Sequence, residues 1–168
     1  MIIQLEAMDT IAFTHESIIN AEVSEINCKA LKQISLSQNS LRSPNNIIKR
    51  INLTSEDEIL FGPSCLHNSK IEEVYLKGKN IIDSGIGLSY ISSLGKLTVE
   101  TEGNFTIQPT SFLSSIVHKI SINCEKSVQI SPVSFKETPD LTDLTIIAKE
   151  EIKFGDSAFK DSNINNLI

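Results

Sequence analysis

Cysteine is scarce in this sequence, and the three cysteines present stand far apart as Cys28, Cys65 and Cys124. No two of them form a Cys-x-x-Cys pair, which argues against the common zinc and thiol-redox motifs. Because three is an odd number, a complete set of disulfides within the chain is excluded. Free cysteine is among the most buried residue types. We therefore expect all three to be small residues of a hydrophobic core.

Positive charge is also in short supply. The chain has 15 lysine and arginine residues against 21 aspartate and glutamate residues, which gives a net charge of -6. A nucleic-acid-binding protein needs a basic patch that neutralises phosphates, and the basic residues here are outnumbered and dispersed. The acidic excess equally disfavours an anionic membrane surface. We expect no nucleic-acid partner.

Long hydrophobic runs are missing as well. A membrane-spanning helix needs about 18 or more consecutive apolar residues, and no stretch approaches that length. The N-terminal residues include Glu6 and Asp9 where a signal peptide carries lysine or arginine. We expect no membrane insertion, and no export signal is visible. The 168 residues, 40% of them hydrophobic and 21% charged, suit one globular domain.

What the sequence does contain is a repeat. Two apolar residues stand two positions apart, and a third stands three positions before the pair. A spacing of two places both members of the pair on one face of a β-strand. The triplets are Leu31/Ile34/Leu36, Ile48/Ile51/Leu53, Ile71/Val74/Leu76, Leu94/Leu97/Val99, Val117/Ile120/Ile122 and Leu141/Leu144/Ile146, and a seventh begins at Ile164/Leu167.

The triplets are regularly spaced. From one middle residue to the next, beginning at Ile34 and ending at Leu167, the steps are 17, 23, 23, 23, 24 and 23 residues. A fixed period of about 20 to 50 residues is typical of solenoids and related repeat architectures. Each coil cannot bury its apolar side alone, so stacked copies share one continuous core.

Other positions repeat in the same phase. Later units carry a large apolar residue eight or nine positions before the middle residue, directly preceded by a small residue. A second apolar pair comes earlier, and proline or aspartate lies between. We interpret this pair as a second short strand, and the proline or aspartate as the start of a tight helical turn. The large residues are Leu66, Leu88, Phe112, Phe135 and Phe159, and the small ones are Cys65, Gly87, Ser111, Ser134 and Ala158.

The predicted fold class is a repeat solenoid. It is a right-handed, β-rich leucine-rich-repeat solenoid of about six to seven 23-residue coils, with short parallel strands and tight helical turns. Residues 31–168 form this solenoid. Residues 1–30, which include Met8/Ile11/Phe13 and Val23/Ile26/Cys28, are predicted to be degenerate or capping coils of the same single domain.

A family resemblance accompanies the repeat. The segment Ile152-Lys-Phe-Gly-Asp-Ser-Ala-Phe-Lys-Asp-Ser-Asn-Ile-Asn-Asn-Leu-Ile168 closely resembles the repeat of BspA-like leucine-rich-repeat proteins, which runs roughly I-x-x-I-G-x-x-A-F-x-x-C-x-x-L-x-x-I. Looser copies over 61–66 and 130–135 extend the resemblance to about residues 30–168. The repeat keeps its glycine only at Gly62 and Gly155, and the family's cysteine after the phenylalanine is absent. The resemblance implies a surface antigen, secreted or at the cell surface, that adheres to host, matrix or other cell-surface proteins.

The sequence offers no arrangement that points to catalysis. His15, His67 and His118 share no spacing that would place two of them in one site. The segment from Asp83 to Gly87 is the nearest approach to a Gly-x-Ser-x-Gly nucleophile elbow, but it lacks the first glycine. The acidic run at 56–58 lacks the spacing of a calcium loop. We predict a protein that is not an enzyme and has no metal or cofactor.

A polar strip should follow the outer face of the predicted main strands. The residue between the two apolar members of each strand points outward, and so do the residues just before and after the pair. In order, the central residues are Ser35, Asn52, Tyr75, Thr98, Ser121 and Thr145, and the first flank begins with Gln33 and Arg50. Aromatic residues and arginine are favoured in binding hot spots. The candidate contact residues are therefore Arg50, Tyr75, Lys96 and Lys119, beside the alternative that this face is simply solvated.

Three functions remain open from sequence. The first is a non-catalytic protein-binding or adhesion module. The second is a structural spacer within a longer repeat protein, since the repeat reaches Ile168 in the middle of a strand pair. The third, a carbohydrate-active β-solenoid enzyme, would need carboxylates gathered at one height, and the outward columns do not supply them. The resemblance implies the cell surface, although the lack of a visible signal leaves a cytoplasmic location open.

Overall fold

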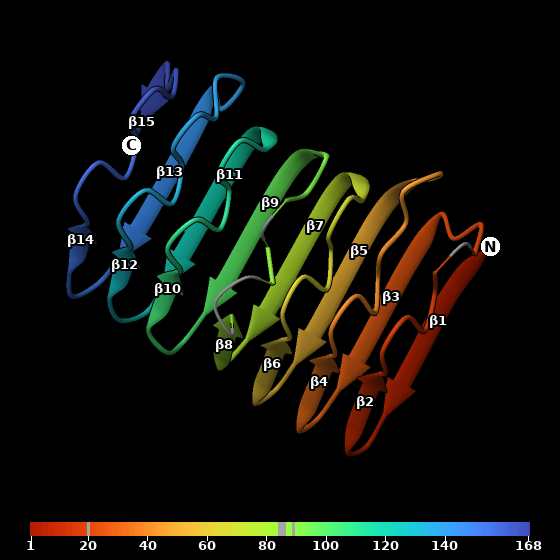
Figure 1. Ribbon diagram of the computed structural model, residues 1–168. Coiled ribbons are helices and arrows are strands. Elements are labelled where there is room, and N and C mark those ends of the chain that lie inside the picture. The colour runs from red at the N-terminus through yellow and green to blue at the C-terminus, as the bar shows by residue number, and fades with distance from the viewer. Residues whose placement is uncertain (20, 84–86, 89) are drawn as a thin grey trace.

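The computed structural model describes residues 1–19, 21–83, 87–88 and 90–168, and it stacks the chain into flattened coils (Figure 1). Each coil from β1 to β14 contributes one long strand and one short strand, and the next coil repeats the path beside it. The last coil contributes only β15 to the long-strand sheet. The long strands are β1 (Ile2–Ala7), β3 (Glu25–Ala30), β5 (Ile47–Ser55), β7 (Lys70–Gly78), β9 (Ser93–Thr101), β11 (Ile116–Cys124), β13 (Asp143–Ala148) and β15 (Asn166–Leu167). The short strands are β2 (Thr10–Phe13), β4 (Gln33–Leu36), β6 (Glu58–Phe61), β8 (Asn80–Asp83), β10 (Phe105–Ile107), β12 (Val128–Ile130) and β14 (Ile152–Phe154).

All strand pairing is between neighbouring coils and parallel. The long strands form an eight-stranded sheet in the order β1-β3-β5-β7-β9-β11-β13-β15. The short strands lie across from it as a four-stranded sheet, β2-β4-β6-β8, and a three-stranded sheet, β10-β12-β14. The prediction of a parallel β-solenoid with coils of about 23 residues is therefore confirmed. The turns are hydrogen-bonded reversals rather than the helical turns that we expected, and the described residues contain no helix.

The strand register shows that the first predicted step of the repeat, from Ile34 to Ile51, does not join equivalent positions. Ile34 and Leu36 lie in β4 of the short sheet, where Ile34 pairs with Ile59. The partner of Ile51 in the long sheet is Ile26, which is 25 residues earlier. The 17-residue step therefore joined a short strand to a long one. The error arose because strands of both sheets carry apolar residues two positions apart, so the pair alone does not identify its sheet.

Residues 1–30 follow the same coil path. In this segment β1 pairs with β3 from Ile2↔Glu25 to Ala7↔Ala30. The short strand β2 pairs with β4 from Thr10↔Gln33 to Phe13↔Leu36. The first coil is therefore in register with both sheets.

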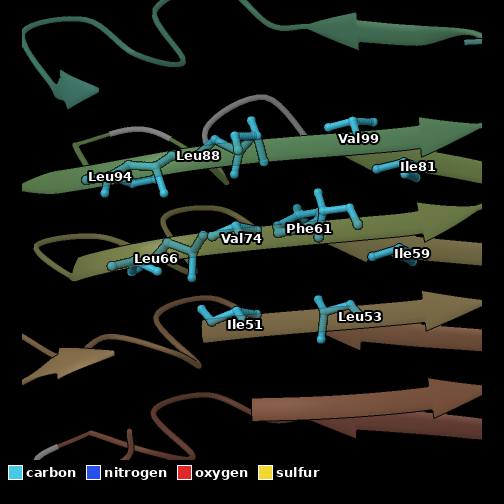
Figure 2. Packing of buried hydrophobic residues seen from close by; sticks show 14 of the residues in the cluster. Ile51, Leu53, Ile59, Phe61, Leu66, Val74, Ile81, Leu88, Leu94 and Val99 are labelled. Carbon is cyan, nitrogen blue, oxygen red and sulfur yellow. The ribbon is translucent and has the colours of Figure 1, made fainter. Parts of the chain in front are cut away.

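The core lies between the long and short sheets. Figure 2 shows the buried cluster, in which Ile51, Leu53 and Val74 come from the long strands. Ile59, Phe61 and Ile81 of the same cluster come from the short strands. Each of these side chains is at most 3% exposed. In the long strands, two successive residues such as Lys49 and Arg50 face outward between two buried ones. This extra outward residue is why the sequence shows a step of three before the step of two.

A third column of large side chains fills the turn side of each coil. Phe112, Phe135 and Phe159 stack face to face, with ring centroids 5.1 Å and then 5.4 Å apart. The small residues before them let neighbouring turns approach closely. The amide of Phe112 donates to Ser134 O, and the amide of Phe135 donates to Ala158 O. The sequence predicted the interior role of these phenylalanines, and their stacking across coils agrees with it.

Asp83 interrupts the row of apolar residues that the short strands turn toward the core. It pairs in register with Phe61, yet it carries a carboxylate and is only 5% exposed. The amide of Gly87 donates to Asp83 Oδ1 over 2.8 Å. The short sheet divides into its two parts just after this residue, between β8 and β10. Ser84, Gly85 and Ile86, which belong to the glycine-containing turn considered above, lie outside the described residues.

Candidate functional site

The outer face of the long sheet presents three polar columns that run across the coils. In each column, every residue is the register partner of the next, because the strands are parallel and in register. The first column contains Glu25, Arg50, Glu73, Lys96, Lys119, Asp143 and Asn166. The second contains Asn27, Asn52, Tyr75, Thr98, Ser121 and Thr145. The third contains Lys29, Thr54, Lys77, Glu100, Asn123 and Ile147.

Ion pairs join neighbouring coils along the first column. Arg50 Nε on β5 donates to Glu73 Oε2 on β7 over 3.2 Å. Lys96 Nζ on β9 approaches the other oxygen of Glu73, at 3.9 Å. One carboxylate therefore lies between two cations from the strands on either side. Since these side chains are roughly one third to one half exposed, the pairs orient the groups more than they stabilise the fold.

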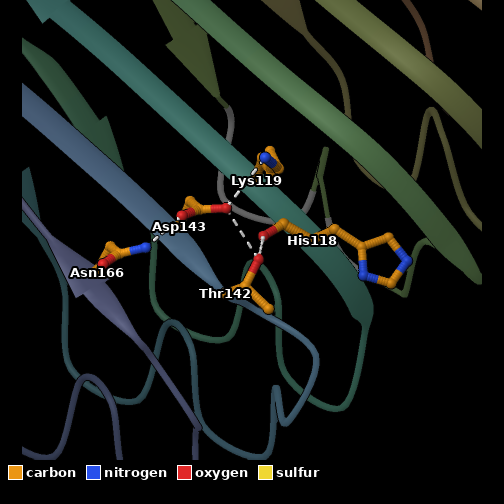
Figure 3. Close-up of polar contacts among 5 residues, drawn as sticks. All are labelled: His118, Lys119, Thr142, Asp143 and Asn166. Carbon is orange, nitrogen blue, oxygen red and sulfur yellow. Dashed lines mark hydrogen bonds and ion pairs between the residues drawn. The ribbon is translucent and has the colours of Figure 1, made fainter.

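A second cluster in this column centres on Asp143 (Figure 3). Asn166 Nδ2 donates to Asp143 Oδ1 over 2.7 Å, and Lys119 Nζ lies 3.2 Å from Asp143 Oδ2. Thr142 Oγ1 lies 3.0 Å from the same Oδ2 and 3.2 Å from the His118 carbonyl oxygen. The bonds from Asn166, Lys119 and Thr142 lower the pKa of Asp143 below its ordinary value. The His118 ring points away from the cluster.

Tyr75 is held in place from the neighbouring strand. It lies between Asn52 and Thr98 in the second column, and its hydroxyl interacts with the Glu100 carboxylate on β9. Partial burial, followed by this interaction and the charge of Glu100, raises the pKa of Tyr75. Glu100 also pairs with Lys77 at 3.4 Å. Tyr75 is the only aromatic residue of the three columns, whose other residues are polar apart from Ile147.

The structure places all four sequence-derived candidates on this face. Arg50, Lys96 and Lys119 share the first column, and Tyr75 lies two residues along β7 from Glu73. Two other residues assigned to the strip are elsewhere: Gln33 and Ser35 lie in β4 of the short sheet.

Their places on the long sheet belong to Glu25 and Asn27 of β3. Sequence reasoning missed these two residues because it took the first 30 residues as irregular. The apolar spacing of Val23, Ile26 and Cys28 was the signal that could have found them.

Comparisons with known proteins return nothing. No family model, no curated protein and no solved structure matches this chain. Function must therefore be inferred from the surface itself and from the resemblance in the repeat.

A shallow groove borders the polar face where four long strands end. It encloses about 810 Å³ and lies along the ends of β5, β7, β9 and β11. Its open shape and charged lining suit contact with a polar surface better than the capture of a small apolar ligand. The charged lining residues are Glu56, Lys77, Lys79, Glu100, Glu102 and Glu125.

The remaining reactive side chains are dispersed. His15 and His118 are exposed, and the rings of His67 and Tyr90 form a T-shaped pair with centroids 5.8 Å apart. Cys28, Cys65 and Cys124 are buried, as the sequence led us to expect, and none of them is in a disulfide. Within the described ranges, no three histidine, cysteine, aspartate or glutamate residues gather as a metal site. The described residues also include no helix with the length and apolarity of a membrane span.

Proposed function

We propose that this protein is a non-catalytic protein-binding module whose contact surface is the outer face of the long sheet. The observation that carries the proposal is the fixed, in-register polar face with Tyr75 near its middle. A β-sheet of stacked coils is a rigid platform, and repeat proteins use such extended surfaces for binding. The repeat's resemblance to BspA-like proteins favours a matrix or cell-surface protein as the partner, and a cell-surface or secreted location.

The ordering of the side chains supports the proposal. Binding costs less conformational entropy when contact groups are held before the partner arrives. Arg50 donates a hydrogen bond to Glu73, and the hydroxyl of Tyr75 interacts with the Glu100 carboxylate. Tyrosine and arginine are also enriched among residues whose removal costs most binding energy.

Binding of the folded chain to immobilised matrix proteins tests the proposal. We expect saturable binding at micromolar concentration or better, and a loss of about tenfold or more for Tyr75→Ala. The matched control is Tyr90→Ala, because Tyr90 is the other tyrosine of the chain and lies exposed on a turn.

A second pair of variants compares cations. Arg50→Ala should weaken binding, whereas Lys153→Ala on the outer side of β14 should not. No saturable binding, or equal losses for the long-sheet variants and their controls, would show that this face is not the contact surface.

One observation favours the spacer function as the second candidate. The ion pairs on the face connect neighbouring coils to each other, as Lys77 does to Glu100 and Lys29 to Glu6. A spacer needs such links along its length and needs no partner. Deleting residues 97–119 removes one 23-residue coil and rejoins the chain in register. A spacer would keep the binding activity of the protein that contains it, whereas a binding module would lose the contact residues in that coil.

A further inference from the structure

The first column contains one step where like charges meet. In this column of described residues, charges alternate in sign from Glu25 through Arg50 and Glu73 to Lys96. The next residue is Lys119, which is the direct register partner of Lys96. Neighbouring strands lie about 4.8 Å apart, and like charges directly opposite each other are destabilising. The fold therefore tolerates an unfavourable juxtaposition at the middle of the proposed contact face.

The carboxylates that pair with these two lysines lie on the outer sides of the lysine pair. Lys96 is paired with Glu73 on β7, and Lys119 is paired with Asp143 on β13. The longer distance, 3.9 Å, belongs to Lys96, and Glu73 is shared with Arg50. No carboxylate of this column lies between the two lysines, and their side chains are 50% and 61% exposed.

Hydroxyl groups accompany the lysine pair. Thr98 and Ser121 lie two residues further along the same strands, are register partners and face the same side. Thr98 Oγ1 is buried from solvent and makes no hydrogen bond to any described residue. Two ammonium groups with neutral hydroxyl neighbours form a place where a single anionic group would relieve the repulsion.

We propose that Lys96 and Lys119 bind one carboxylate of an acidic side chain on the protein partner. This inference rests on the proposed function and names the chemistry of its contact. The flanking carboxylates Glu73 and Asp143 decide the class of anion. They would repel the adjacent charges of a polyanion such as nucleic acid or a sulfated polysaccharide, and they leave room for one isolated aspartate or glutamate within a neutral segment.

A titration followed by nuclear magnetic resonance tests this site. The probe is a capped pentapeptide, Gly-Ser-Glu-Ser-Gly, and its control has glutamine in place of glutamate. We expect the glutamate peptide to shift the backbone amides of residues 96 and 119, saturating with a dissociation constant on the order of tens of millimolar, as two exposed ion pairs allow. The glutamine peptide should leave these amides unshifted. At about 1 M salt the shifts should vanish, because the screening length falls to about 3 Å.

Variants distinguish binding at the lysine pair from attraction of the peptide carboxylate to any exposed cation. Lys96→Gln and Lys119→Gln should each abolish saturation by the glutamate peptide. Lys77→Gln is the matched control, because Lys77 is equally exposed on the same face and its register neighbours are Thr54 and Glu100. Equal losses in all three variants, absent shifts with the glutamate peptide, or saturation by a sulfated oligosaccharide alone would overturn the inference.

The outcomes also separate this inference from the proposed function. If a matrix protein binds through Tyr75 but the glutamate peptide does not bind, the carboxylate site fails while the contact surface stands. If the glutamate peptide binds through Lys96 and Lys119 but no protein binds the face, the proposed function fails while the carboxylate site stands.

Discussion

At the scale of single residues, burial sets the behaviour of the three cysteines. Burial raises the pKa of Cys28 from its ordinary value of 9.0 to about 11. It also raises the pKa of Cys65, where the nearby Asp83 adds to the effect, and the pKa of Cys124. The thiolate is the nucleophilic form of cysteine. In the folded protein these thiols are protected from reagents because they are buried and because they stay protonated.

The first prediction concerns the chemistry of these thiols. In native buffer at about pH 8, iodoacetamide should leave Cys28, Cys65 and Cys124 unmodified, and in denaturant all three should react. Mass spectrometry of the alkylated protein measures this. Modification of any one cysteine in the native state at its unfolded rate would show that its coil is open.

The second prediction is a pH dependence. Because the folded pKa of Cys28 lies above the unfolded value, its contribution to stability is complete below pH 9.0 and is lost as pH rises through about 11. The free energy of unfolding in urea should therefore fall between about pH 8 and pH 10.5, and it should fall less in Cys28→Val. An identical decrease in the variant and the parent would assign the dependence to other groups.

Turn residues carry backbone strain that can be tested one position at a time. Val133 has a φ of 53°, although its side chain is β-branched. Val133→Gly should raise the free energy of unfolding by about 1 kcal/mol, because glycine adopts this conformation without a steric penalty. Thr106→Gly in β10 is the control and should lower stability by about 0.5 to 1 kcal/mol. If both variants lose stability equally, the turn does not have this conformation.

At the scale of elements, the corner after each long strand is a column of small residues. Ala30, Ser55, Gly78, Thr101 and Cys124 occupy it in successive coils. Three of them donate to a backbone carbonyl of the preceding coil: Ser55 Oγ to Lys32 O, Thr101 Oγ1 to Lys79 O, and Cys124 Sγ to Gly103 O. Gly78 has no side chain to make this bond.

The vacant position at Gly78 supports a stabilising substitution. A Cβ atom there would have no neighbour closer than 3.5 Å. Gly78→Ser should raise the free energy of unfolding by about 1 kcal/mol, through lower backbone entropy in the unfolded chain and one added hydrogen bond. Gly103→Ser is the matched control and should destabilise, since its Cβ would lie 2.7 Å from Asn80 Oδ1. Thermal unfolding of both variants measures the difference, and a destabilised Gly78→Ser would contradict the corner geometry.

The predictability of the elements varied along the chain for physical reasons. From Ile48 onward, the step of three followed by two marked each long strand, because an outward bulge recurs in coil after coil. Around Ile34 the pattern misled, since both sheets bury alternate residues and the loop before β5 is two residues longer than usual.

The candidate site could be predicted only in outline. Alternation along a strand tells which residues face outward, so Tyr75, Lys96 and Lys119 were placed on one face from sequence. Their partners could not be predicted. Whether Lys96 turns toward Glu73 or another group depends on side-chain rotamers across strands that are distant in sequence.

At the scale of the whole molecule, stability depends on contacts between neighbouring coils. In solenoids each repeat contacts its neighbours alone, so damage to one coil affects the coils on both sides. Phe135 is fully buried between the rings of Phe112 and Phe159. It is therefore a point at which three successive coils are joined.

Phe135→Asp should destabilise the protein by about 4 kcal/mol or more, because it removes a large core side chain and buries a charge. Urea unfolding gives the free energy, and hydrogen exchange should show lost protection in the coils of Phe112 and Phe159. Gln129→Asp, on the exposed side of β12, is the control and should change stability by about 0.5 kcal/mol or less. Parental stability in Phe135→Asp would place this residue outside the core.

The central claim is that all coils stack in one register, so that their outward residues form a single surface. Spin labels at Asn27→Cys and Thr145→Cys test it, because these positions share one column and the buried native thiols should resist labelling. Five strand spacings separate them. Double electron–electron resonance should give one narrow distance distribution near about 24 Å. A broad distribution, or a main distance beyond about 35 Å, would contradict the continuous stack of coils.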